Sequence, residues 1–216
     1  MRPRTSHLTA AATLAAALLL TACGGGGGGD KKIDASGTGT PAPAPSASTT
    51  ASESAPPGPV FDFPRDVKVV VDADPTGDAV KDAVLRDQAY AQQAVYLALA
   101  TLDPKLPAYK AYVTGLAAGY WDSQLHWGQN HHTTITGTTL FYDRKVTVTD
   151  ATTAGVTFCE SQRDTFDKDT KTGKVTRTTP SLDDFTAHTA RMKKSADGTW
   201  QMTDYRSQDR AKSCQR

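Results

Sequence analysis

The chain has 216 residues, with 24 Lys and Arg against 23 Asp and Glu, and its formal net charge is +1. This balance excludes the strongly basic surface with which nucleic-acid-binding domains neutralise phosphates, so no nucleic-acid partner is predicted. The composition changes twice along the chain and divides it into residues 1–22, 23–60 and 61–216. The last part has the length of one domain.

Residues 1–22 have the composition of an export signal. Arg2 and Arg4 precede an Ala- and Leu-rich run from Leu8 to Leu20, and small residues follow it. The apolar run is shorter than the roughly 20 residues that a membrane-spanning helix needs. The sequence therefore predicts a signal peptide.

The segment Leu20-Thr21-Ala22-Cys23 resembles the lipobox of bacterial lipoproteins. The resemblance implies cleavage by signal peptidase II before Cys23, and a diacylglyceryl thioether with palmitate-like acyl chains on that cysteine. Two long acyl chains anchor a protein durably, because each buried methylene contributes about 0.8 kcal/mol. The alternative is an ordinary signal peptide cut after an A-x-A-like site, which would leave Cys23 as a spare thiol.

Residues 23–60 are predicted to form a disordered tether. Six glycines follow Cys23, and Pro, Ala, Ser, Thr and Gly dominate the rest. Such a composition cannot bury enough apolar surface to offset the entropy lost on ordering. A flexible chain of this length has an r.m.s. reach on the order of 35 Å.

The domain is predicted to begin with a strand and a helix. Val67–Val71 is a short run of mostly β-branched residues, typical of a strand. A helix follows, with Asp74 as the expected N-cap and Thr76 and Asp78 as rival caps, and it ends before Pro104. Its apolar positions recur at the spacing of one helix face: Val80, Val84, Ala91, Val95, Ala98 and Leu102.

A second helix is predicted from about Ala108 to His126. Its many aromatic residues favour a role as the wall of a pocket. The positions expected to face the core are Tyr109, Tyr112, Val113, Leu116, Tyr120 and Trp127.

From Thr133 onward the apolar pattern has a period of two, which predicts strands. Turn residues at 169–173 and 196–198 predict antiparallel hairpins. Helices followed by hairpins indicate an α+β fold with a sheet of about four to five strands. The expected strands are Thr138–Tyr142 with Lys145–Thr149, Gly155–Phe166, Ser181–Lys194 and Thr199–Tyr205.

This order of elements resembles the NTF2-like, or cystatin-like, cone, in which N-terminal helices pack into the concavity of a curved antiparallel sheet. The strand at Val67–Val71 departs from the simplest cone, which begins with a helix, and is expected as an added edge strand.

Several segments carry a second resemblance: Phe63–Val69, Thr76–Asp78, Phe158–Glu160, Asp167–Asp169, Lys171–Val175, Trp200 and Cys214. They are similar to segments of small secreted lipoproteins of high-GC Gram-positive bacteria, a group without an assigned activity.

With Cys23 lipidated, Cys159 and Cys214 remain as one pair in an oxidising compartment. We expect a disulfide between them that fastens the C-terminal tail to the sheet. The alternative is a redox-active or nucleophilic Cys159, but the sequence offers it no C-x-x-C partner.

Resemblance to the cone implies that an enzyme of this fold would carry an acid/base pair, Asp and His or Tyr and Asp, in its cavity. The pocket candidates are Tyr90, Tyr120, Trp121 and Tyr142, together with His188 and Asp204. His188 alternates with Phe185, Ala187 and Thr189 along its strand. It is therefore expected on the face opposite those residues, exposed to solvent.

Two further patterns are weak candidates for metal sites. His126, His131 and His132 cluster near the end of the second helix, although a polar helix terminus is the preferred interpretation. The segment Asp72–Asp78 resembles the start of a calcium loop, but Ala83 occupies the position of the bidentate Glu. No metal or other cofactor is assigned.

These patterns predict a lipid-anchored, extracytoplasmic domain at the cell membrane. We expect a non-catalytic module that binds a small molecule or an envelope protein. One alternative is a hydrolase or isomerase of the cone fold with a cavity acid/base pair. Another is metal or envelope sensing through His126, His131 and His132.

Overall fold

The computed structural model describes residues 58–216. The predicted signal peptide, the lipidation site Cys23 and nearly all of the predicted tether lie outside the described residues and stay predictions. No helix in residues 58–216 is long and apolar enough to cross a membrane.

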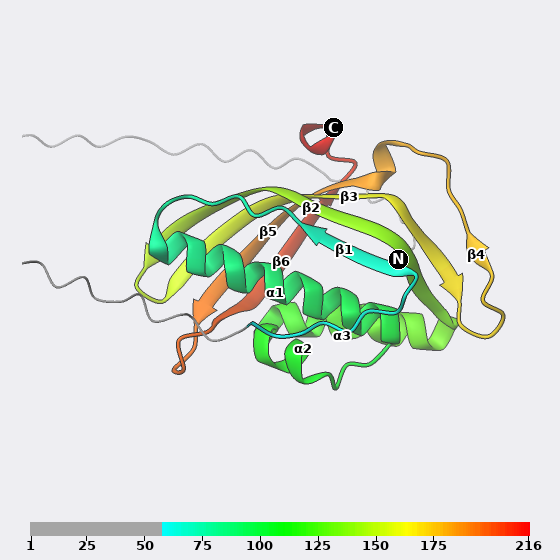
Figure 1. Ribbon diagram of the computed structural model, residues 1–216, viewed down its shortest axis with the longest axis horizontal. Coiled ribbons are helices and arrows are strands. Elements are labelled where there is room, and N and C mark those ends of the chain that lie inside the picture. The colour runs from blue at the N-terminus through cyan, green and yellow to red at the C-terminus, as the bar shows by residue number, and fades with distance from the viewer. Residues whose placement is uncertain (1–57) are drawn as a thin grey trace, which may run out of the picture. The chain divides into compact units, whose positions relative to one another are not determined.

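The described residues form three α-helices and a six-stranded sheet (Figure 1). The helices are α1 (Ala79–Thr101), α2 (Pro107–Tyr112) and α3 (Gly115–His131). The strands are β1 (Val67–Val71), β2 (Thr133–Asp150), β3 (Thr153–Asp169), β4 (Val175–Thr176), β5 (Phe185–Lys194) and β6 (Trp200–Asp209). Short 3-10 helices precede β5, at Leu182–Asp184 (η1), and follow β6, at Lys212–Cys214 (η2).

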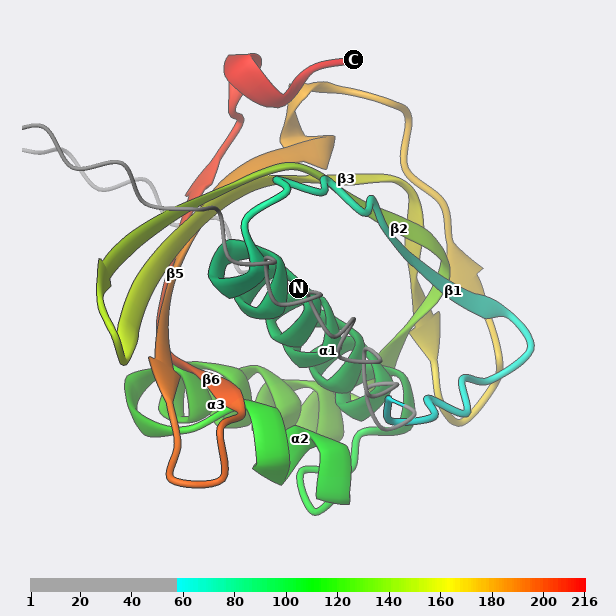
Figure 2. The same cartoon turned by 60° about the vertical axis from the view of Figure 1, so that its left-hand side comes forward.

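The strands follow the order β1-β2-β3-β5-β6, and β4 pairs with the far end of β3. All neighbours are antiparallel except β1, which runs parallel to β2 at the sheet edge. Figure 2 shows the sheet curving around α1, while α2 and α3 close the open side of the curve. The predicted α+β class is thus confirmed, with helices in the concavity of a curved, mostly antiparallel sheet.

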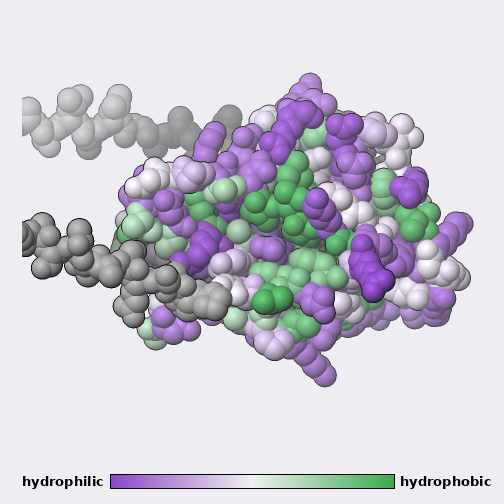
Figure 3. All heavy atoms as spheres, in the orientation of Figure 1, coloured by the Kyte–Doolittle hydropathy of each residue, from purple (hydrophilic) through white to green (hydrophobic). Residues whose placement is uncertain are grey.

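The main core fills the space between α1 and the concave face of the sheet. Helix α1 is buried on nearly every side over its second half, because it lies inside the curve of the sheet. Figure 3 shows apolar side chains gathered in the middle of the face that carries β1 and α1, with hydrophilic side chains around them. This core draws on all three helices and on strands β2, β3, β5 and β6, so residues 58–216 have a core of their own and we expect them to fold by themselves.

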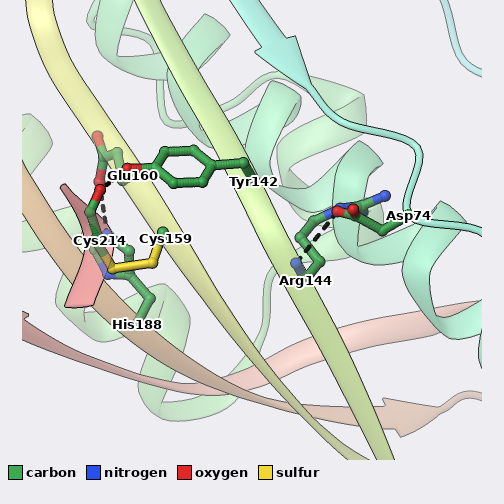
Figure 4. Close-up of a disulfide and its surroundings, with 7 residues drawn as sticks. All are labelled: Asp74, Tyr142, Arg144, Cys159, Glu160, His188 and Cys214. Carbon is green, nitrogen blue, oxygen red and sulfur yellow. Dashed lines mark hydrogen bonds and ion pairs between the residues drawn. A yellow bond between two sulfur atoms is a disulfide. The ribbon is translucent and has the colours of Figure 1, made fainter. Parts of the chain in front are cut away.

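A smaller cluster covers the convex face of the sheet. It contains Tyr142, Cys159, Phe185, Ala211 and Cys214. Cys159 on β3 and Cys214 in η2 form the predicted disulfide, across 55 positions of the chain (Figure 4). The bond fastens the C-terminal tail over the convex face.

Helix α1 begins later in the chain than expected, because Asp74, the preferred N-cap, does not cap it. Asp78 is the N-cap, and its carboxylate accepts hydrogen bonds from the backbone N–H groups of Val80 and Lys81. Asp74 has a left-handed backbone, with a φ of 44°, whereas an N-cap residue typically has an extended backbone. Its side chain instead forms an ion pair with Arg144 on β2, which holds the loop before α1 against the sheet (Figure 4).

The predicted second helix is two helices, and this expectation was wrong. The backbone N–H of Thr114 donates to the carbonyl of Met202 on β6, which breaks the helix there. Gly115 follows with a φ of 58°, where a Cβ would lie 2.9 Å from the carbonyl oxygen of Thr203. Because α3 starts afresh at Gly115, its side chains do not continue the rotation of those on α2. Leu116 is therefore 73% exposed instead of facing the core.

Candidate functional site

A chain of buried polar side chains crosses the concave face of the sheet. Nε2 of His188 lies 2.7 Å from Oε2 of Glu160, and Nδ1 of His188 lies 2.7 Å from the Tyr205 hydroxyl. The hydroxyl of Tyr96 donates to Oε1 of Glu160, and the Gln162 amide donates to the same oxygen over 2.5 Å. We call Tyr96, Glu160, His188 and Tyr205 the buried relay. Figure 4 shows the contact between Glu160 and His188 beside the disulfide.

The sheet register brings three members of the relay together. Glu160 on β3 lies opposite Thr186, and His188 lies two residues further along β5, on the same face. Tyr205 on β6 lies opposite Ala190, which is again two residues along from His188. Successive strands thus present these side chains diagonally to one another, at a spacing that long and aromatic side chains can span. Tyr96 reaches Glu160 from α1, which lies inside the curve of the sheet.

The buried relay holds an ionised carboxylate. Burial raises the pKa of Glu160, but hydrogen bonds from His188, Tyr96 and Gln162 and the charge of His188 outweigh it, and the net pKa is lowered. Burial and the neighbouring Glu160 charge raise the pKa of Tyr96 well above its usual value, so its phenol stays protonated. A carboxylate only accepts hydrogen bonds, so Nε2 of His188 carries the proton in that contact.

The expectation that His188 is exposed was wrong, because the residue is only 5% exposed. His188 does lie on the face opposite Phe185 and Ala187. That face is the concave one, which the helices cover, whereas Phe185 and Ala187 contact the smaller cluster on the convex face. Apolar residues therefore occupy both faces of β5, and alternation alone could not identify the side turned to the core.

Aromatic side chains fill the space around the buried relay. The His188 ring stacks on Phe158 at 4.9 Å and on Tyr205 at 5.2 Å between ring centroids. Trp121 on α3 packs on Tyr205 at 4.8 Å, and Tyr96 packs on Phe141 at 5.2 Å. Trp121 is 6% exposed, and the other rings are 7% exposed or less. The concave face is thus a packed core around a polar line.

Some polar atoms in the core lack a partner among residues 58–216. They are both side-chain polar atoms of Gln92, Nε2 of Gln88 and the indole Nε1 of Trp121. Gln88 does accept a hydrogen bond from Arg144 through its oxygen, over 3.0 Å. Gln88 and Gln92 lie on α1 at the spacing that leads to Tyr96, so they continue the polar line along the helix.

The four pocket candidates occupy different parts of the molecule. Tyr120 and Trp121 lie beside the buried relay, because both rings contact Tyr205. Tyr90 packs against Phe61 and Tyr112, away from the relay contacts. Tyr142 lies on the convex face, where its hydroxyl donates to the carbonyl of Cys214.

Two weaker candidates also lie away from the buried relay. Asp204 is next to Tyr205 in sequence but is paired with Arg206, at 3.7 Å. The segment Asp72–Asp78 serves as the entry to α1, with Asp74 held by Arg144 and Asp78 as the cap.

The three clustered histidines lie on the surface around the end of α3. Nδ1 of His131 contacts the carbonyl of Trp127, and the two rings stack at 4.4 Å. His132 is the C-cap, with a left-handed backbone, and His126 lies on an exposed part of the helix. Within residues 58–216, no three His, Cys, Asp or Glu side chains are grouped as a metal site would require.

A cavity of about 240 Å³ lies on the other face of the sheet. It is lined by Val70, Thr138, Leu140, Ser161, Arg163, Asp164 and Arg216. We call it the convex cavity, because Leu140 belongs to the cluster on the convex face. Its lining combines two guanidinium groups, one carboxylate, two hydroxyl groups and apolar residues.

Sequence reasoning missed Glu160, Tyr96 and Tyr205 as site residues. Glu160 is one of only two glutamates in the chain, and its neighbour Cys159 was predicted to form a disulfide. Alternation therefore turns Glu160 to the face of Val156 and Phe158. Glutamate is rare in this chain, and Glu160 continues the apolar positions Val156 and Phe158 at a spacing of two. This pattern was the available signal for a buried carboxylate.

Comparison with known proteins gave likenesses to solved structures only. No family model and no curated protein matches the chain. A ketosteroid isomerase-like protein from Erwinia carotovora atroseptica is 19% identical, with 56% of this chain and 92% of that chain covered, at a TM-score of 0.37. The intermembrane space region of the chloroplast protein ARC6 is 14% identical, with 62% and 99% covered, at a TM-score of 0.39.

A protein from Novosphingobium aromaticivorans, provisionally named a scytalone dehydratase, is 10% identical. The match covers 60% of this chain and 87% of that chain, at a TM-score of 0.34. At these identities and TM-scores, none of the likenesses carries information about function.

Proposed function

We propose that the chain is a lipid-anchored, non-catalytic binding module of the bacterial cell envelope, built on an NTF2-like cone. The observation that supports this most directly is that donors of the protein itself occupy both oxygens of Glu160. Its two oxygens accept hydrogen bonds from three side chains of the protein itself, and the residue is 2% exposed. A general base needs a position within hydrogen-bond reach of a reactant, and this carboxylate faces protein donors instead.

The packing around the buried relay supports the same proposal. Catalysis by an acid/base pair needs room for a reactant beside the pair. Here the rings of Phe158 and Tyr205 stack on His188, and Trp121 packs on Tyr205. These side chains fill the space beside the pair. The relay then serves to fix three strands and α1 relative to one another, because its bonds join β3, β5, β6 and the helix.

The anchor is tested by a Cys23→Ala variant of the full chain, expressed in a Gram-positive host. We expect the parent protein in the membrane fraction and the variant in the medium, because the variant has no thiol to lipidate. A Gly24→Ala variant, which keeps that thiol, is the control and should stay with the membrane. Membrane attachment of the Cys23→Ala protein would contradict the proposed anchor.

The binding role is tested by native and denaturing mass spectra of the exported chain. A mass excess present only under native conditions would identify a retained small molecule. A clean apo mass, followed by capture of one envelope protein after crosslinking at the cell surface, would identify a protein partner. Neither outcome would contradict a non-catalytic role, whereas turnover of a retained compound would.

The second candidate function is a cone-fold hydrolase or isomerase. It is favoured by one observation, the 2.7 Å contact between a carboxylate and an imidazole. Diethyl pyrocarbonate, which acylates accessible imidazoles, separates the two functions. We expect it to modify the exposed His126, His131 and His132 in the folded chain and to spare His188. Rapid modification of His188 under native conditions would favour the enzyme.

A further inference from the structure

We propose that the convex cavity binds a small carboxylate that carries an N–H group on the neighbouring carbon. A free amino acid and the carboxyl-terminal residue of a short peptide share this chemistry. The inference rests on the proposed function as a binding module, and it names the place and the ligand class.

The volume of the convex cavity limits the ligand to a small group. At about 240 Å³ it is smaller than the roughly 300–1,000 Å³ of pockets that enclose drug-sized ligands. Its walls come from β1, β2, β3 and the tail that the disulfide fastens to the sheet. A group of a few heavy atoms fits this space, and a large ligand could insert only one end.

A β-bulge builds one wall of the convex cavity. Thr138 pairs with Asp164, but Leu140 pairs with Ser161, so β3 has one residue more than β2 between these pairs. The extra residue lets Ser161 and Asp164 face the same side, with Arg163 reaching the cavity beside them. Gln162 turns to the other side and donates to Glu160. Bulges re-aim side chains in this way and are frequent next to functional sites.

Arg216 is held in place before any ligand arrives. Its guanidinium lies 3.7 Å from the centre of the Tyr142 ring and 3.2 Å from a carboxylate oxygen of Asp72. Tyr142 is in turn fixed by its hydrogen bond to Cys214, one partner of the disulfide. A positioned guanidinium loses less conformational entropy on binding than a free one.

Arg163 supplies the second cation and is available for a ligand. It is exposed, and within residues 58–216 its side chain forms no hydrogen bond or ion pair. Guanidinium groups present their donors in a planar fork that matches the two oxygens of a carboxylate. Two such groups in one small cavity therefore favour a carboxylate.

The rest of the lining selects against a plain anion. Asp164 brings a negative charge to the convex cavity, and Asp72 already neutralises part of the charge on Arg216. This weakens the attraction for a phosphate dianion and offers an acceptor to a ligand N–H. Val70 and Leu140 provide apolar contact for a small side chain. A carboxylate with a neighbouring N–H group satisfies all three features.

The test is a titration of ¹⁵N-labelled residues 58–216, followed by amide chemical shifts. The probes are alanine, N-acetylalanine, alaninamide, propionate and inorganic phosphate. We expect alanine or N-acetylalanine to shift the amides of Ser161, Arg163 and Asp164 with a millimolar dissociation constant. Alaninamide, which lacks the carboxylate, and propionate, which lacks the N–H, should bind at least tenfold more weakly. Tighter binding of N-acetylalanine would identify a peptide end, and tighter binding of alanine a free amino acid.

Variants of the lining make the test specific. Arg163→Gln should weaken binding of the preferred probe about tenfold. Asp164→Asn should weaken binding of the preferred probe by a larger factor than binding of propionate. Arg206→Gln is the matched control, because that side chain is 81% exposed and lies on β6, outside the cavity lining. Its affinity should equal that of the parent.

Four results would overturn the proposal: no shifts with any probe, phosphate binding as tight as alanine, equal binding of alaninamide, or full affinity in the Arg163→Gln variant. If native mass spectra show a retained ligand and Arg163→Gln does not change its retention, the convex cavity is not the binding site. The proposed function as a binding module would still hold. Acylation of His188 in the native chain would instead count against the non-catalytic function. It would not bear on ligand binding at the convex cavity.

Discussion

Nε2 of His188 donates to Oε2 of Glu160 over 2.7 Å, and each side chain is only 3% exposed. Removing one member of such a buried pair leaves the other without its partner in the core, which costs more than the pair contributes as a whole. The contact therefore makes the stability of the domain sensitive to either residue.

Glu160→Gln should lower the free energy of unfolding by about 3 kcal/mol. The amide keeps the shape but loses the charge-assisted bonds from His188, Tyr96 and Gln162. The measurement is urea unfolding followed by circular dichroism. Asp62→Asn, at an exposed position, is the control and should change the free energy by less than about 0.5 kcal/mol. Equal stability of the two variants would mean that the relay contributes nothing.

The pH dependence of stability follows from the lowered pKa of Glu160. A group whose pKa is depressed by folding contributes its stability fully above its unfolded pKa, here near 4.5, and loses it as the pH falls through the folded value. The parent should therefore be destabilised below about pH 4.5 more steeply than Glu160→Gln, and the two unfolding midpoints should converge as the pH falls further. Parallel curves between pH 7 and pH 3 would contradict the assignment.

Gln92 and Gln88 should respond oppositely to replacement by Met. Neither polar atom of the Gln92 side chain has a partner among residues 58–216, so Gln92→Met should raise the free energy of unfolding by about 1 kcal/mol. Gln88 accepts from Arg144, so Gln88→Met should lower it by a similar or larger amount. Thermal unfolding of both variants beside the parent provides the comparison. Destabilisation by Gln92→Met would show that the amide is satisfied in solution.

Gly137 allows β2 to approach β3 closely. Its φ is 95°, and a Cβ there would collide with the backbone carbonyl oxygen of Asp164. Gly137→Ala should destabilise the domain by at least about 1–3 kcal/mol from the backbone strain alone. Gly155→Ala, on β3 with open space at the Cβ position, is the matched control. A stability loss confined to Gly137→Ala in urea unfolding is expected, and equal losses would point to a general effect of alanine in the sheet.

The disulfide should contribute about 4 kcal/mol, because it closes a loop of 55 positions in the unfolded chain. The double variant Cys159→Ser/Cys214→Ser should lose this amount in urea unfolding. A reductant should lower the stability of the parent toward that of the variant and leave the variant unchanged. The mass of the untreated parent should lie two hydrogens below that of the reduced chain, and a reduced mass would refute the bond in the exported protein.

The amino-acid sequence by itself predicted the α+β class, the antiparallel pairing after Thr133 and the bond between Cys159 and Cys214. Each depends on local or countable features: the hydrophobic period, turn residues between strands, and two cysteines left after Cys23. Asp78 was among the predicted caps for the same reason, since capping involves residues within one turn of the helix.

The tertiary structure decided which of these residues belong together. The break at Thr114 is fixed by a hydrogen bond to Met202, far along the chain, and the glycine beside it, Gly115, does not by itself specify a break. His188 was assigned to the correct side of its strand, but only the fold shows that the helices cover that side. The buried relay and the convex cavity depend on the register of neighbouring strands and on one bulge between Thr138 and Leu140. Register is a long-range property, because a shift of one residue turns every side chain of a strand to the opposite face.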